Sequence, residues 1–365
     1  MSNTVNTIKE FFLIPIIFTI AALTASFGYG YVSGDHSIGT AVNYLTITAI
    51  LGMMELSLSF DNAIVNATKL EDMSAIWQKR FLTWGMIIAV FGMRFLFPLI
   101  IVSIFGHVAP WSAVSMALFA PDQYAKTLES ASPMISAFGG NFLLMVALNF
   151  FFDPSGEKDT HWIAPVERAM TAFGSKADTL GIVALILTID VFVASHLGAD
   201  HAGSFMISAV AGIITFGLVE IMSGFMESDE EETDGNKAIT AVRTGGFAAF
   251  LYLEVQDASF SFDGVIGAFA LSHMLVVIAL GLGIGAVFVR GLTLLLVKNK
   301  TLNTNIYLEH GAFWAILFMA MVMEFKPYGE LPDVVVGLTS AGLLGLAYMS
   351  SKRHAKKEAA AEITA

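Results

Sequence analysis

Long apolar segments recur along the whole chain and constrain its fold more than any other feature of the sequence. Of the 365 residues, 56% are hydrophobic and only 14% are charged, which is outside the usual range of a soluble domain of this length. Many of the apolar runs approach the roughly 17–25 residues that a helix needs to cross a bilayer. The sequence therefore predicts an all-α, polytopic membrane protein whose main solvent is lipid.

We predict ten transmembrane helices from the apolar runs between charged or Gly/Pro-rich stretches. They cover roughly residues 11–32, 42–66, 80–106, 134–152, 179–197, 202–225, 245–270, 272–297, 311–325 and 333–350. Residues 111–120 are apolar but too short to cross, and Pro110 and Pro121 bracket them, so we expect a re-entrant or surface segment there.

The distribution of Lys and Arg supports this count. If both termini are cytoplasmic, 15 of the 19 Lys and Arg residues fall in inner segments, as the positive-inside rule requires. We therefore expect a multi-pass protein of the cell inner (plasma) membrane. Lys9 precedes the first apolar run, so a cleaved signal sequence is an alternative for the first span.

An internal repeat carries acidic residues into the predicted spans. Residues 55–67 read ELSLSFDNAIVNA, and residues 257–269 read DASFSFDGVIGAF at a constant offset of 202. The span that follows each motif contains one arginine, Arg94 or Arg290. We predict two five-span repeats of inverted topology, residues 1–178 and 179–350, followed by a basic cytoplasmic tail at 351–365. In this architecture the two acidic motifs face each other across the interface between the repeats.

The four motif acids need a compensating interaction. An ionised carboxylate at the centre of a transmembrane helix costs about 2.5–3.5 kcal/mol. Protonation, pairing with Arg94 or Arg290, a hydrated cavity or a bound cation would each offset this cost. The acids are Glu55, Asp61, Asp257 and Asp263.

Helical spacing places Glu55 and Asp61 on different stripes of one helix. A straight helix would not direct both carboxylates to one point, so either the helix is interrupted near the motif or the acids mark successive positions on a path. Gly264 and Gly267 favour an interruption in the second motif, whereas the first motif is preceded only by Gly52.

The ligand types present indicate which ions such a site would bind. The chain has no cysteine, so thiolate ligation is excluded, and carboxylate, amide and hydroxyl oxygens suit Mn²⁺, Mg²⁺ or Ca²⁺. We predict metal ligands at Glu55, Asp61, Asn62, Asp257 and Asp263. Further polar residues within the spans could extend a substrate pathway: Ser57, Ser59, Ser259, Ser261, Glu254, Asp190 and Glu220.

The E-x-S-x-S-F-D-N and D-x-S-x-S-F-D-G motifs, each followed by an arginine in the next span, resemble the TerC (tellurium-resistance) family. The resemblance covers most of residues 40–350, and the long loop at 153–178 is similar to less characterised relatives of that family. It implies a membrane exporter of small solutes with a role in manganese homeostasis. It also implies that Glu55, Asp61 and Asn62 are site residues with Asp257 and Asp263 as counterparts, while Gly264 replaces the second asparagine.

We therefore expect a non-enzymatic transporter that exports a divalent cation, Mn²⁺ in preference. In an alternating-access cycle its carboxylates would bind metal and protons in turn. The cation is a substrate and no permanently bound cofactor is expected. Expected partners are the bilayer, the metal ion and, in addition, the secretion machinery or further copies of the chain; no nucleic acid is expected.

Three other interpretations remain open. The acids and arginines could form an ion-pair network that only holds the two halves together. The protein could assist the assembly or metallation of secreted or membrane proteins, as some TerC relatives are thought to do. An intramembrane aspartyl protease also uses two aspartates, but its G-x-G-D motif is missing, since GLGIG at 281–285 is not followed by an acid.

Overall fold

The computed structural model describes residues 11–71, 73–105, 107–153, 161–227, 235–269 and 271–364, and these contain helices and no strand. The first half comprises α2 (Leu13–Ser33), α3 (Ile38–Leu58), α4 (Phe60–Glu71), α5 (Ala75–Arg80), η2 (Phe81–Gly85), η3 (Ile88–Leu96), α6 (Phe97–Phe105), α7 (Pro110–Phe119) and α8 (Pro121–Phe152). The remainder comprises α9 (Ala164–Ala194), α10 (Ala199–Glu227), α11 (Gly235–Phe269), α12 (Leu275–Lys298), α13 (Thr301–Thr304), α14 (Leu308–Glu324), η5 (Lys326–Tyr328) and α15 (Asp333–Thr364).

Several of these helices are long and apolar enough to cross a membrane. Within the described ranges there are six: Leu13–Ser33, Ile38–Leu58, Ala75–Ile104, Pro121–Phe152, His201–Met222 and Leu275–Lys298. The chain is therefore a polytopic all-α membrane protein. The other four predicted spans overlap the second part of α9, α11, α14 and α15, so ten crossings remain a prediction.

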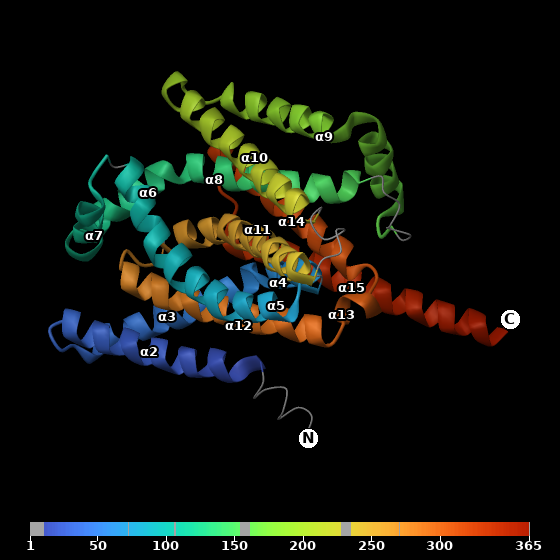
Figure 1. Ribbon diagram of the computed structural model, residues 1–365. Helices are drawn as coiled ribbons and strands as arrows, with labels where there is room; N and C mark the ends of the chain where they lie inside the picture. The colour runs from blue at the N-terminus through green and yellow to red at the C-terminus, as the bar shows by residue number, and fades with distance from the viewer. Residues whose placement is uncertain are drawn as a thin grey trace.

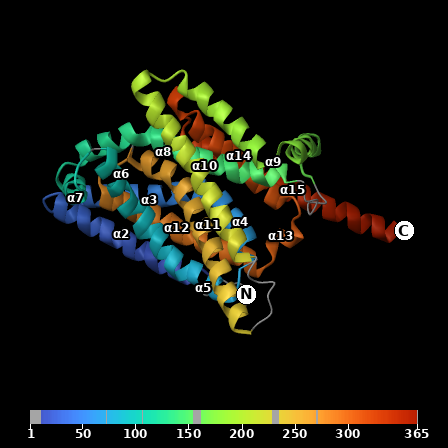
Figure 2. The ribbon, with the colours of Figure 1, turned by 45° about the horizontal axis from the view of Figure 1, so that its top comes forward.

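The bundle has α2 on one side and α9 and α10 on the other in both views (Figures 1 and 2). Helix α12 packs against α2, α3, α4 and η3, and α8 packs against α9, α10, α11 and α14. At its C-terminal end α15 extends beyond the other helices (Figure 1), so the predicted basic tail continues this helix through Thr364.

The loop predicted at 153–178 is wrong for its second part. Residues Ala164–Ala177 form a helix, and the chain bends by 111° between it and Thr179–Ala194. Glu167 caps the start of this helix, since its carboxylate accepts hydrogen bonds from the backbone N–H groups of Trp162 and Ile163. The bend coincides with the predicted boundary between the two repeats. The short apolar segment between Pro110 and Pro121 is α7, which is too short to span.

The helix that carries the first motif is interrupted, as one of the two interpretations predicted. Helix α3 ends at Leu58, α4 begins at Phe60, and Ser59 lies between them. The second motif behaves differently, because α11 continues through Gly264 and Gly267 without a break. Here a glycine provides space: a Cβ added to Gly264 would lie 2.9 Å from Glu55 Oε2.

Close packing of α3 against α12 explains the GLGIG sequence at 281–285. A Cβ added to Gly281 would lie 2.6 Å from Leu51 Cβ, and one added to Gly285 would lie 2.5 Å from Glu55 Cβ. Glycines spaced four residues apart let two membrane helices approach closely. These two glycines hold α12 against the part of α3 that carries Glu55.

Candidate functional site

Glu55 and Arg94 form the first buried charge cluster, and each residue is only 2% exposed. Arg94 comes from η3, a π-helical stretch of the kind often found at functional sites. Its Nη2 donates to Glu55 Oε1, which also accepts a hydrogen bond from Ser59 Oγ at 3.0 Å. Arg94 Nε donates to the Leu282 carbonyl of α12 at 3.1 Å. Glu55 is thus neutralised between α3, η3 and α12.

Arg290 of α12 organises the second buried cluster. Its Nη2 lies 3.2 Å from both Glu254 Oε1 and Asp257 Oδ2, which are on α11. Its Nη1 donates to the Phe81 carbonyl at 3.0 Å, and the guanidinium carbon lies 4.2 Å from the centre of the Phe81 ring. Two acids therefore share one arginine.

The two clusters have related contacts. In each, the first acid of a motif pairs with the arginine of the following helix: Glu55 with Arg94, and Asp257 with Arg290. Each arginine also donates to a backbone carbonyl. Arg94 donates to Leu282 of α12, the helix that carries Arg290, and Arg290 donates to Phe81 of η2, which leads into η3 and Arg94. The motifs themselves meet at Glu55, which approaches Gly264 of the second motif.

Asp61 is buried without such a partner. It lies in the first turn of α4, just after the break, and is 1% exposed. Its Oδ1 accepts a hydrogen bond from the backbone N–H of Asn62 at 2.9 Å, whereas Oδ2 accepts none from any described residue. Asn62 Oδ1 and Asn66 Oδ1, on the same helix, also accept none from the described part of the chain. Asp61 therefore differs from Glu55 in having no counter-charge there.

The other predicted residues are dispersed. Ser57 is exposed and donates to the Met53 carbonyl, Ser259 donates to the Val255 carbonyl, and the Ser261 hydroxyl is buried without a described partner. Glu220 accepts a hydrogen bond from Asn149 at 3.4 Å. The Asp263 side chain lies outside the described residues. Among the side chains that the structure describes, no three His, Asp or Glu residues come together as a metal site.

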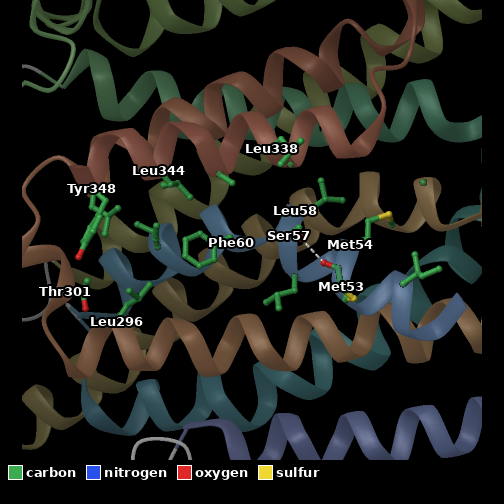
Figure 3. Close-up of a pocket in the computed structure, with 18 of the residues that line it drawn as sticks. Met53, Met54, Ser57, Leu58, Phe60, Leu296, Thr301, Leu338, Leu344 and Tyr348 are labelled. Carbon is green, nitrogen blue, oxygen red and sulfur yellow. Dashed lines mark hydrogen bonds between the residues drawn. The ribbon is translucent and has the colours of Figure 1, made fainter. Parts of the chain in front are cut away.

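A cavity of about 1150 Å³ lies beside the break between α3 and α4. Figure 3 shows Met54, Leu58 and Phe60 on one side of it and Leu338 and Leu344 of α15 on the other. Among the described residues its lining contains no charged side chain, and its polar side chains are those of Ser57, Thr301 and Tyr348. This cavity fits an acyl chain of a lipid better than a metal ion.

Sequence reasoning missed two buried acids, Glu324 and Glu167. Glu324 ends α14 and shares a hydrogen-bond donor, Asn141, with Asp190. Its position as the last polar residue of an apolar run was the available signal. Glu167 stood in an apparently solvated loop, and nothing in the sequence marked it.

Glu167 joins the start of α9 to the first turns of α14. Besides capping α9, it accepts a hydrogen bond from Trp314 Nε1 at 2.8 Å, and its Oε2 lies 2.9 Å from His310 Nδ1. Burial raises the pKa of Glu167, but the contacts with His310, Trp314 and the Ile163 backbone outweigh this effect and lower the pKa to about 2.

We expect Glu167→Gln to lower the free energy of unfolding by about 1–2 kcal/mol at neutral pH, because it weakens charge-assisted hydrogen bonds at the start of α9. Since the folded-state pKa is depressed, this contribution is present above the ordinary value of 4.5 and is lost as the pH falls towards about 2. Thermal unfolding of both proteins in detergent at neutral and acidic pH measures it. A difference that grows on acidification would contradict the assignment.

Comparison with known proteins identifies one family. A family model described as a protein of unknown function (DUF475) matches residues 60–358, which include Asp61, the whole second motif and both arginines. No curated protein and no solved structure matches the chain.

Proposed function

Because the chain belongs to the DUF475 family, a family of unknown function, we propose an activity from its own buried charges: it is a membrane transporter that exports a divalent metal cation, Mn²⁺ in preference. The observation that carries the proposal is Asp61, a buried carboxylate with no counter-charge among the described residues. A proton or a cation must stabilise it.

The two arginines distinguish Asp61 from the first acid of each motif. Both are already engaged by the first acids of the motifs and by Glu254, and among the described residues neither pairs with Asp61. We assign ion binding first to Asp61 and to its repeat counterpart Asp263. Glu55 and Asp257 then serve mainly to hold the two halves in register through their arginines.

The helix that carries Asp61 offers further oxygen atoms to a hard cation. Asn62 and Asn66 each contribute a buried amide oxygen that accepts no hydrogen bond from the described chain, and oxygen ligands of this kind are preferred by Mn²⁺, Mg²⁺ and Ca²⁺. The resemblance of the motifs to TerC proteins favours Mn²⁺ among the three.

The broken helix supports an alternating-access mechanism. In secondary transporters, binding sites form where a membrane helix is interrupted, at the interface between inverted repeats. The related contacts of Arg94 and Arg290 agree with such a repeat. In the proposed cycle, Asp61 and Asp263 bind the cation from the cytoplasm and exchange it for protons on the outer side.

The test is Mn²⁺ transport by the full chain in proteoliposomes that contain an Mn²⁺-sensitive dye. We expect Asp61→Asn to lower the initial rate at least about tenfold, equivalent to 1.4 kcal/mol in the barrier, because the amide keeps the shape of the side chain but not its charge. Glu129→Gln, an exposed acid on α8, should transport normally.

Mg²⁺ and Ca²⁺ assayed in parallel rank the three cations. Equal rates for Asp61→Asn and wild type would remove Asp61 from the site. Wild-type rates no higher than those of protein-free liposomes for all three cations would overturn the proposed function.

A further inference from the structure

Three fully buried polar side chains from α8, α9 and α14 meet away from the acidic motifs. Asn141, Asp190 and Glu324 are each 0% exposed. Asn141 Nδ2 donates to Asp190 Oδ1 at 3.0 Å and to Glu324 Oε2 at 2.9 Å. One amide nitrogen therefore bridges two carboxyl groups.

The two carboxyl groups lie close together, because each accepts a hydrogen bond from the same amide nitrogen, at 3.0 and 2.9 Å. A hydrogen bond between carboxyl groups requires a proton on one of them, and two adjacent carboxylates in a medium of low dielectric constant do not both ionise. Neither group forms an ion pair with a Lys, Arg or His in the described part of the chain. One proton shared by the pair would therefore stabilise it.

The positions of Glu324 and Asp190 near the C-terminal ends of their helices also favour a protonated carboxyl group. Glu324 is the last residue of α14, and Asp190 lies four residues before the end of α9. The C-terminal end of a helix carries a partial negative charge, which disfavours a carboxylate and favours the neutral acid.

Charged groups on the surrounding elements have other partners. Lys326 of η5 lies 3.5 Å from Glu330, His196 contacts the Phe192 carbonyl, Glu220 of α10 pairs with Asn149, and His310 of α14 contacts Glu167. None of these, nor His201 of α10, hydrogen-bonds to Asp190 or Glu324 within the described residues.

Three buried acceptor atoms show that the cluster is incomplete as it stands. Asp190 Oδ2, Glu324 Oε1 and Asn141 Oδ1 accept no hydrogen bond from described donors. A buried acceptor without a donor is destabilising, and a proton on either carboxyl oxygen removes one such acceptor. Asn141 points into the cluster and orients both carboxyl groups by donating a hydrogen bond to each.

We propose that Asn141, Asp190 and Glu324 form a proton-binding site, in which the carboxyl pair takes up and releases a proton. In the predicted orientation, the site lies towards the outer ends of α9 and α14, where an exporter would load protons. Its role as the coupling site rests on the proposed cation transport, whereas proton binding itself does not.

Infrared difference spectroscopy of the purified full chain in nanodiscs tests proton binding. At neutral pH we expect wild type to show a C=O stretching band of a protonated carboxyl group that shifts in D₂O. Glu324→Gln and Asp190→Asn should each remove that band, while Glu330→Gln, an exposed acid in the loop after α14, should keep it. A neutral-pH spectrum that is the same in wild type and in both buried-acid variants would overturn the proposal.

Transport driven by a pH gradient tests coupling. Because Asp61 and Asp263 also exchange protons in the proposed cycle, Glu324→Gln should weaken rather than abolish the stimulation of Mn²⁺ flux by a proton gradient, and leave cation exchange without a gradient intact. If the band disappears in the variants but wild type transports no cation, the proton site stands and the proposed function fails. If transport occurs and Glu324→Gln responds normally to the gradient, the coupling role is wrong.

Discussion

Replacing Arg290 with leucine is expected to lower the free energy of unfolding by about 3–5 kcal/mol, because it leaves buried acids without their counter-charge. Glu254 and Asp257 are both buried and both depend on the same guanidinium group. The variant also loses the hydrogen bond to the Phe81 carbonyl, which joins α12 to the start of the helix that carries Arg94. Thermal unfolding in detergent, with the yield of folded protein, measures the effect.

Two further variants separate charge from packing. Arg290→Lys restores one positive charge but not the planar fork that reaches two acids and a carbonyl, so we expect only partial recovery. Adding Glu254→Gln and Asp257→Asn to Arg290→Leu removes the uncompensated charges and should recover much of the loss. Arg168→Leu, at an exposed position on α9, should have little effect. No recovery in the triple variant would show that Arg290 acts by packing alone.

The membrane character of the chain could be predicted from hydropathy, because lipid requires long apolar helices whatever the tertiary packing. The number of crossings is harder to predict. Helix α11 contains Glu254 and Asp257, which lower its hydropathy, and α14 has only 17 residues. Such helices lie in the bundle because other helices cover their polar groups, and a single segment does not contain that information.

The break between α3 and α4 and the unbroken course of α11 are a second feature that depends on neighbouring helices and could not be predicted from one segment. Glycine content favoured an interruption in the second motif, but the interruption occurs at Ser59 in the first. Gly264 instead accommodates the Glu55 carboxylate from another helix, a contact between residues 209 positions apart in the sequence. A glycine requirement set by a neighbouring helix cannot be distinguished from a flexible hinge in one sequence.

The residues of the candidate site were likewise predicted only in part from the sequence. The repeat identified Glu55, Asp61 and Asp257, and their burial agrees with acids inside the membrane. It did not show which acids pair with the arginines, or that Asp61 has no counter-charge among the described residues. Glu324 and Asn141 were missed because they meet Asp190 only through the packing of α8 against α9 and α14.

Gly285→Leu is the second substitution with a large expected effect, a loss of about 3 kcal/mol or more in the free energy of unfolding, because it overpacks the contact between α3 and α12. The first added carbon would lie 2.5 Å from Glu55 Cβ and Cγ and 2.9 Å from the Leu56 backbone nitrogen. Backbone cannot rotate away, so α12 must shift, and the carbonyl of Leu282 that binds Arg94 must shift with it. Stability and Mn²⁺ flux should therefore fall together.

Gly342→Ala in α15 is the matched control, and it is expected to raise the free energy of unfolding rather than lower it. No atom lies within 4 Å of the added carbon there, and alanine is favoured over glycine inside a helix by about 0.5–1 kcal/mol. This variant should unfold at a slightly higher temperature and keep its Mn²⁺ flux. Gly285→Ala should be destabilised less than Gly285→Leu, because its single added carbon displaces α12 less. If Gly285→Leu unfolds at the wild-type temperature, α3 and α12 are not in the close contact on which the position of Glu55 depends.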